Sequence, residues 1–174
     1  MTFDRGWISI FGSGRVSEKE MGYQQGVMLG RLLAGAGFGV CTGGYGGIME
    51  AAVRGARSAG GDTAGVIIGT ARSKPNEWVQ TLYEEPTWSE RLMKLITIGS
   101  GYVVMDGGVG TLNEFLMVWE MANKNLHKKP IILLGELVKQ CVQDLKKNQW
   151  VEGVDKPALA ESPKHVIELL NEAL

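Results

Sequence analysis

Short apolar runs alternate with longer amphipathic segments along this chain, and this alternation predicts its secondary structure. Strands are expected where the apolar runs are short and rich in β-branched residues, at Trp7–Phe11, Phe38–Thr42, Ala64–Ile68, Tyr102–Met105 and Ile131–Leu134. Helices are expected where apolar residues recur at helical spacing, at Ser17–Gly35, Ile48–Ala59, Glu90–Ile98, Leu112–Asn123, Glu136–Lys147 and Pro163–Leu174. Strands that alternate with helices predict an α/β fold with a doubly wound, mostly parallel sheet flanked by helices.

Capping residues and loop composition refine some of these boundaries. Ser17 with Glu20 three residues later forms a candidate capping box, and Ser89 is a candidate N-cap. The stretch Gly69–Trp88 contains prolines and tryptophans without a clear period, so it is expected to be an irregular binding loop. A short edge strand is expected within residues 153–160.

Three glycine-rich turns follow predicted strands and form the main candidate site. They are Gly12-Ser13-Gly14, Gly43-Gly44-Tyr45-Gly46-Gly47 and Gly107-Gly108-Val109-Gly110. Ligands in open α/β sheets bind outside the carboxyl ends of the strands, so the three turns should line one crevice. The third turn also opens a helix, whose first backbone amides and positive dipole end suit a phosphate. Thr111 can add a hydroxyl donor, and the carboxylate of Glu114, one turn into the helix, can reach back over the same spot.

Known nucleotide-binding motifs of other kinds are incomplete in this sequence. Neither the turn at Gly12 nor the turn at Gly108 has the third glycine of a dinucleotide fingerprint. Thr42 ends the second predicted strand, where an NAD enzyme would carry an acidic residue for the ribose. The sequence also lacks the GxxxxGK[ST] motif of P-loop proteins. A mononucleotide or another small phosphate ester therefore fits better than a dinucleotide.

Composition narrows the class of protein further. A length of 174 residues predicts a single domain, and a net charge of −1 gives no basic excess for nucleic acid or a membrane surface. The two cysteines, Cys41 and Cys141, form no CxxC pair, which favours a reducing, cytoplasmic setting. Because the chain has only two histidines in addition to these two cysteines, a zinc site with the usual ligands is not expected. The first residues do not have the pattern of a signal peptide, and no apolar run reaches transmembrane length.

Two motifs resemble those of the Lonely Guy (LOG) family. Residues 43–51, Gly-Gly-Tyr-Gly-Gly-Ile-Met-Glu-Ala, are similar to GGGxxGxM, and residues 106–114, Asp-Gly-Gly-Val-Gly-Thr-Leu-Asn-Glu, are similar to PGGxGTxxE. The resemblance implies a Rossmann-like nucleotide-binding domain. It also implies a cofactor-independent, oligomeric phosphoribohydrolase that releases a base and ribose 5-phosphate from nucleoside 5′-monophosphates. The same superfamily includes molybdenum-cofactor carrier proteins, which bind without hydrolysing nucleotides. The family's older label, lysine decarboxylase, does not fit, because no lysine lies beside the glycine turns to form a Schiff base.

The resemblance assigns roles to individual residues. Glu114 matches the motif glutamate and Arg91 matches an arginine on the preceding helix, at the family's spacing, and both are implied to be catalytic. Residues expected to bind substrate or its phosphate are Gly12, Ser13, Gly43, Gly44, Gly46, Gly47, Met49, Gly107, Gly108, Val109, Gly110 and Thr111. Asp106 stands where the family has proline, which is expected to put a modulating carboxylate beside the phosphate. Leu92 stands where a basic residue is usual, which removes a positive charge.

The chemistry of N-glycosidic cleavage explains what Glu114 and Arg91 could do in such a reaction. The transition state resembles an oxocarbenium ion, so a carboxylate such as Glu114 can stabilise its charge or orient water. The guanidinium of Arg91 can hold a phosphate or a base by charge-assisted contacts. On the residues alone, Glu114 could equally complement the helix dipole and Arg91 could be a surface helix residue. Two functions stay open: a nucleoside 5′-monophosphate phosphoribohydrolase, and a carrier for a nucleotide or molybdenum cofactor without turnover.

The sequence also predicts self-association. The helix after the third turn carries more apolar residues than one buried stripe needs: Phe115, Leu116, Met117, Val118, Trp119 and Met121. The equivalent helix of a twofold partner is the simplest cover for the surplus. We therefore expect a homodimer or larger homo-oligomer by light scattering at micromolar concentration, and a monomeric mass would contradict this.

Overall fold

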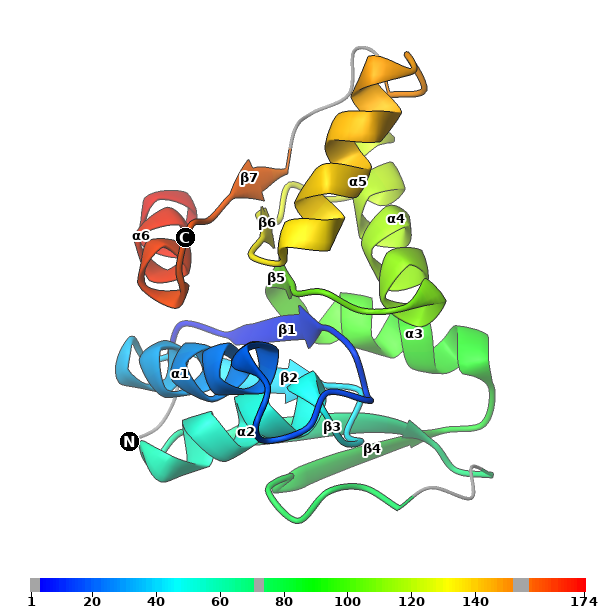
Figure 1. The fold of residues 1–174 in the computed structure, drawn as a ribbon. Helices are drawn as coiled ribbons and strands as arrows, with labels where there is room; N and C mark the ends of the chain where they lie inside the picture. The colour runs from blue at the N-terminus through cyan, green and yellow to red at the C-terminus, as the bar shows by residue number, and fades with distance from the viewer. Residues whose placement is uncertain (1–3, 71–73, 152–156) are drawn as a thin grey trace.

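The computed structural model describes residues 4–70, 74–151 and 157–174, and it contains one seven-stranded sheet (Figure 1). The strands are β1 (Trp7–Phe11), β2 (Gly39–Thr42), β3 (Thr63–Ile68), β4 (Thr81–Glu85), β5 (Gly99–Val104), β6 (Ile131–Leu133) and β7 (Ala158–Leu159). Their order across the sheet is β4-β3-β2-β1-β5-β6-β7, and every pairing is parallel. Strands β2 to β4 lie on one side of β1 and β5 to β7 on the other, so the topological switch point, where such sheets bind ligands, lies between β1 and β5.

Helices cover both faces of the sheet, as the alternating pattern predicted. They are α1 (Met21–Gly35), α2 (Ile48–Ser58), α3 (Trp88–Ile98), α4 (Val109–Asn123), α5 (Glu136–Lys147) and α6 (Pro163–Ala173). One apolar core lies under α1, α2 and α6, and the other lies under α3, α4 and α5. The α/β doubly wound fold is therefore confirmed. Within the described ranges, no helix is long and apolar enough to cross a membrane.

Helices α1 and α2 pack closely because glycines remove side chains at their crossing. A Cβ at Gly30 of α1 would overlap the Ala52 carbonyl group of α2, and a Cβ at Gly55 of α2 would overlap the Val27 carbonyl group of α1. Helix α2 begins directly after the second glycine turn, so its close packing against α1 also helps to position that turn.

Several elements differ from the sequence prediction, and three of these differences have local reasons. The stretch expected to be irregular contains the edge strand β4, which is mostly exposed and has no apolar run. Helix α1 begins at Met21, and the Glu20 side chain accepts the Ser17 backbone N–H at 2.7 Å, so only half of the expected capping box forms. Helix α3 begins two residues earlier than expected, because Thr87 is its N-cap and accepts the Glu90 N–H.

Asp106 joins the end of β5 to a distant helix. Its two carboxylate oxygens accept the backbone N–H groups of Glu136 and Val138, each at 3.1 Å, in the first turn of α5. Gly135, which precedes that helix, lies so close to Asp106 that a Cβ there would overlap its carboxylate. Asp106 therefore supplies the capping acceptor that α5 lacks at its own N-cap residue.

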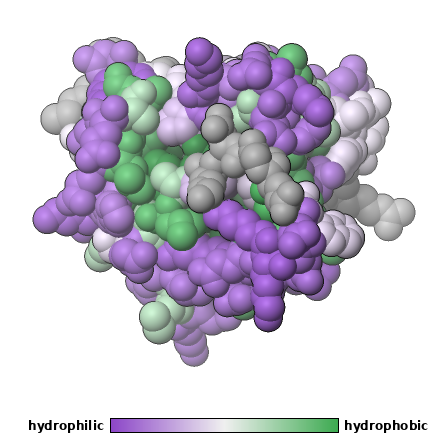
Figure 2. Space-filling model, turned by 90° about the horizontal axis from the view of Figure 1, so that it is seen from above, coloured by the Kyte–Doolittle hydropathy of each residue, from purple (hydrophilic) through white to green (hydrophobic). Residues whose placement is uncertain are grey.

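Apolar side chains on α4 exceed those the core uses, as the sequence predicted. Phe115, Val118 and Trp119 are buried, whereas Leu116 and Met117 are exposed. Further exposed apolar residues include Leu137 on α5 and Leu159 on β7. Figure 2, seen from above, shows an apolar area that interrupts a mostly hydrophilic face. The homodimer stays a prediction.

The close crossing of α1 and α2 predicts a sharp difference between two glycines. Gly30→Ala should destabilise the protein by about 1–3 kcal/mol, because the new methyl overlaps the backbone of α2. Gly35→Ala, on the same helix with nothing within 4 Å, should cause no loss. Urea denaturation of both variants measures the difference, and equal stability would contradict the packing.

The cap provided by Asp106 predicts a loss of stability on truncation. Asp106→Ala leaves two N–H groups of α5 without their acceptor and should cost about 0.5–2 kcal/mol. Asp106→Asn keeps one acceptor oxygen and should cost less. Thermal unfolding measures both variants, and a parent-like melting temperature for Asp106→Ala would show that the cap contributes nothing.

Candidate functional site

Hydrogen bonds join the three glycine turns at the carboxyl edge of the sheet. The Ser13 N–H donates to the Asp106 carbonyl at 3.0 Å, linking the first turn to the third. The Ser13 carbonyl accepts the Ile48 N–H at 2.8 Å, linking the first turn to the start of α2. Two glycines permit this approach, since a Cβ at Gly47 would overlap the Ser13 carbonyl and a Cβ at Gly107 would overlap the Thr111 hydroxyl. The expectation that the turns meet at one crevice is therefore confirmed by the fold.

A cleft of about 770 Å³ opens above these turns. Its walls are Gly12, Ser13, Gly14, Arg15, Tyr45, Met49, Ile68, Trp88, Arg91, Gly108, Val109, Gly110, Thr111 and Glu114. This volume is within the range of small-molecule pockets. Most of the residues expected at the site line the cleft, whereas Gly43, Gly44, Gly46, Gly47 and Gly107 are not among its walls and instead shape the turns around it.

Arg91 is held toward the cleft by backbone carbonyls. Although it lies on α3, its side chain is buried and only 9% of the residue is exposed. Its Nε donates to the Val66 carbonyl at 2.8 Å, and its Nη2 donates to the Gly43 carbonyl at 3.3 Å. A Cβ at Gly43 would overlap this guanidinium, which explains why the turn needs glycine there. Arg91 is therefore not a solvated surface residue of its helix.

Glu114 lies opposite Arg91 in a desolvated position. Its Oε1 is 3.7 Å from Nη1 of Arg91, and both side chains are largely buried. Burial raises the pKa of Glu114 to about 7, and the positive charge of Arg91 only partly opposes this shift. A carboxyl group that exchanges its proton near neutral pH is suited to act as a base or as a stabilising anion.

The start of α4 provides the expected anion-binding end of the cleft. Gly108 is its N-cap residue, and the first N–H groups of a helix have no acceptor within the helix. Thr111 is buried beside this turn and also lines the cleft. In the described part of the chain, no group of three or more His, Cys, Asp or Glu side chains could hold a metal ion. The polar groups of this end therefore suit an anion such as phosphate.

Two departures from the family motif lie outside the cleft. The Asp106 carboxylate is bound by the first turn of α5, so it does not face the phosphate turn as the sequence suggested. Leu92 is buried in the core under α3, α4 and α5. Neither residue lines the cleft, and a modulating role for Asp106 there has no structural support.

Three cleft residues were not singled out from the sequence: Arg15, Tyr45 and Ile68. Trp88, in the stretch expected to be a binding loop, also lines the cleft. Arg15 directly follows the first turn and brings a cation to the cleft. The ring of Tyr45 lies 5.7 Å from the guanidinium carbon of Arg91, and its hydroxyl accepts the Ile68 N–H at 3.4 Å. The glycine turns after the first two predicted strands were an available signal for Arg15 and Tyr45, which lie beside or within these turns.

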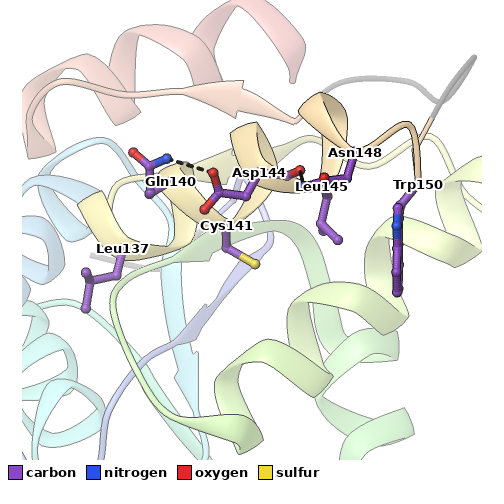
Figure 3. A pocket seen from close by; sticks show the side chains of 7 residues that line it. All are labelled: Leu137, Gln140, Cys141, Asp144, Leu145, Asn148 and Trp150. Carbon is purple, nitrogen blue, oxygen red and sulfur yellow. Dashed lines mark hydrogen bonds between the residues drawn. The ribbon is translucent and has the colours of Figure 1, made fainter.

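A second cavity, of about 540 Å³, lies along α5 (Figure 3). Its polar groups already bond to one another: Gln140 donates to the Asp144 carboxylate at 3.1 Å, and the Asn148 side chain donates to the Asp144 carbonyl at 2.8 Å. The remaining walls are mainly apolar and include Leu137, Leu145 and Trp150. This cavity contains none of the glycine turns, so it does not compete with the cleft as an anion site.

Known proteins similar to this chain include cytokinin riboside 5′-monophosphate phosphoribohydrolases and molybdenum cofactor binding proteins. A cytokinin riboside 5′-monophosphate phosphoribohydrolase from Mycobacterium tuberculosis is 32% identical over 109 residues, which cover 61% of this chain and 58% of that enzyme. The match to a similarly named enzyme from Rhodococcoides fascians covers 47% of its length, so this chain spans about half of these enzymes. The molybdenum cofactor binding protein from Rippkaea orientalis has a TM-score of 0.79 and 25% identity, covering 96% of each chain.

A further solved structure shares the fold over nearly the whole chain. The molybdenum cofactor carrier protein from Chlamydomonas reinhardtii has a TM-score of 0.73 and 20% identity, with 97% of each chain covered. At the level of sequence families, residues 5–161 match the SLOG cluster4 family. Because that match includes all the cleft residues and most of the chain, this protein belongs to the SLOG cluster4 family.

Proposed function

We propose that this protein is a nucleoside 5′-monophosphate phosphoribohydrolase, which hydrolyses the N-glycosidic bond to give a base and ribose 5-phosphate. The observation that carries the proposal is the buried pair of Arg91 and Glu114, 3.7 Å apart, beside the start of α4. The phosphoribohydrolases at about 30% identity support the same reaction.

The substrate's phosphate would bind at the β5 side of the cleft. The amides at the start of α4 and the Thr111 hydroxyl are donors there, and Arg15 adds a positive charge. The ribose would then extend toward Glu114, which lies one turn further along the same helix. This places the anomeric carbon close to the carboxylate.

Bond cleavage would develop positive charge on the ribose while the C1′–N bond breaks and the base takes up a proton. The Glu114 carboxylate stabilises this charge, orients a water toward C1′ and can accept the proton that the water loses. Arg91 keeps a fraction of Glu114 ionised despite its burial, and it is fixed by its two carbonyl partners. The active form of Glu114 in this mechanism is the carboxylate.

The alternative is a carrier that binds a nucleotide-like phosphorylated ligand without turnover. It is supported by the molybdenum cofactor binding protein from Rippkaea orientalis, whose structure is similar over 96% of its length at 25% identity. Both functions use the same phosphate end of the cleft. The presence of Arg91 and Glu114 in contact favours hydrolysis. Self-association and a cytoplasmic location stay predictions under either function.

The decisive experiment is to incubate the protein with AMP, GMP, CMP and UMP and to assay the release of ribose 5-phosphate. Release from at least one monophosphate is expected. The rate should rise with pH through about 7, because deprotonation of Glu114 gives the active carboxylate. Glu114→Gln should lower turnover on the order of 10²–10³-fold and flatten that pH dependence.

Glu120→Gln is the matched control, because Glu120 lies on the same helix, is exposed and pairs with Lys124. Its turnover should equal that of the parent protein. Parent-like activity of Glu114→Gln would overturn the role of Glu114. If no monophosphate is cleaved while nucleotides still bind, the hydrolase proposal loses its support and the carrier function is favoured.

A further inference from the structure

Asn76, which precedes β4, holds the second glycine turn from outside the cleft. Its side-chain amide nitrogen donates to the Gly44 carbonyl at 3.1 Å and to the Tyr45 carbonyl at 2.8 Å. Its backbone N–H also donates to the Gly44 carbonyl, at 2.8 Å, and its side-chain oxygen accepts the Trp78 N–H at 3.1 Å. Both donors and the acceptor of this partly buried amide are therefore used.

The turn after β2 depends on such outside contacts, because four of its five residues are glycine. Gly44 and Gly47 adopt φ values of +78° and +66°, and glycine has many other conformations open to it. The Thr42 hydroxyl accepts the Gly44 N–H at 3.1 Å, so the end of β2 holds one side of the turn. Asn76 holds the carbonyl side.

The same turn supplies one of the two carbonyls that orient Arg91. The guanidinium donates to the Gly43 carbonyl at 3.3 Å and to the Val66 carbonyl at 2.8 Å. Val66 belongs to β3, which is paired on both sides within the sheet, whereas Gly43 belongs to the glycine turn. The position of this turn therefore decides where the second acceptor of Arg91 lies.

The segment of residues 74–80, which contains Asn76, is anchored to the start of β3. The Thr63 hydroxyl donates to the Trp78 carbonyl at 2.7 Å, and the Gln80 side-chain oxygen accepts the Thr63 N–H at 3.1 Å. Trp78 and Val79 also pack against the core under α1, α2 and α6. Asn76 therefore joins the glycine turn to a segment that β3 and the core hold in place.

We propose that Asn76 is a positioning residue of the site, which fixes the turn after β2 and thereby directs the Arg91 guanidinium at Glu114. Asn76 is not among the walls of the cleft, so it acts through Arg91. Its effect on turnover rests on the proposed function, whereas its effect on the charged pair does not. The charged and titratable side chains that line the cleft with Glu114 are Arg15, Tyr45 and Arg91. A neutral substitution of Asn76 changes the charge of none of them.

The test follows the ionisation of Glu114 by carbon-13 NMR of its side-chain carboxyl group, which needs no substrate. The charge of Arg91 lowers the pKa of Glu114 against the effect of burial, so Arg91→Gln should raise this pKa. Asn76→Ala should raise the titration midpoint by a smaller amount, about half a pH unit, because the guanidinium keeps its charge but loses its fixed orientation. The midpoint of the pH profile of turnover should move with it.

Asn76→Ser is a second variant with less risk to folding. Its hydroxyl can still accept the Trp78 N–H, but it cannot donate to both carbonyls of the turn. It should therefore raise the titration midpoint as Asn76→Ala does. Thermal unfolding of each variant shows that it is folded over the pH range of the titration.

Gln80→Ala is the matched control, because Gln80 anchors the same segment to β3 through Thr63 instead of binding the glycine turn. It should leave the Glu114 midpoint as it is in the parent, even where it lowers stability. If the Asn76 variants leave the midpoint unchanged or lower it, or if Gln80→Ala raises it equally, the positioning role is wrong. If the midpoint rises only in the Asn76 variants and no monophosphate is cleaved, the positioning role holds while the proposed function fails.

Discussion

The Arg91 guanidinium is held from behind by two backbone carbonyls, and the arrangement of the cleft depends on this contact. The carbonyls belong to β3 and to the turn after β2, so one side chain from α3 connects three segments that are distant in sequence. A buried guanidinium is stable only when its donors are satisfied, and here the carbonyls leave one nitrogen for Glu114. Arg91 and Glu114 are therefore largely buried, yet both line the cleft.

Glycines, which have no side chain, are as important to the shape of the cleft as its charged residues are. Gly43 leaves room for the guanidinium, Gly47 lets α2 start against the first turn, and Gly107 lets the third turn approach Thr111. Each turn is thereby joined to the next by backbone hydrogen bonds rather than by side chains. The result is a cleft whose floor is backbone, which allows a phosphate to approach peptide N–H groups directly.

The sequence predicted the sheet and the shared edge of the turns, because these depend on local patterns and on the rules of parallel sheets. Strand β4 was missed because it is an exposed edge strand without an apolar run. The role of Asp106 was misjudged because its partners, Glu136 and Val138, lie about thirty residues away and no local pattern connects them. Trp88 was read as part of an irregular loop, since the start of α3 depends on the Thr87 cap.

The central claim is that one cleft binds phosphate at the start of α4 and presents the anomeric carbon to Glu114. A crystal structure of the Glu114→Gln variant with AMP tests it most directly. The account predicts the phosphate on the amides of residues 108–111 and C1′ in contact with the side chain at position 114. A phosphate bound away from the start of α4, or a ribose out of reach of position 114, would contradict it.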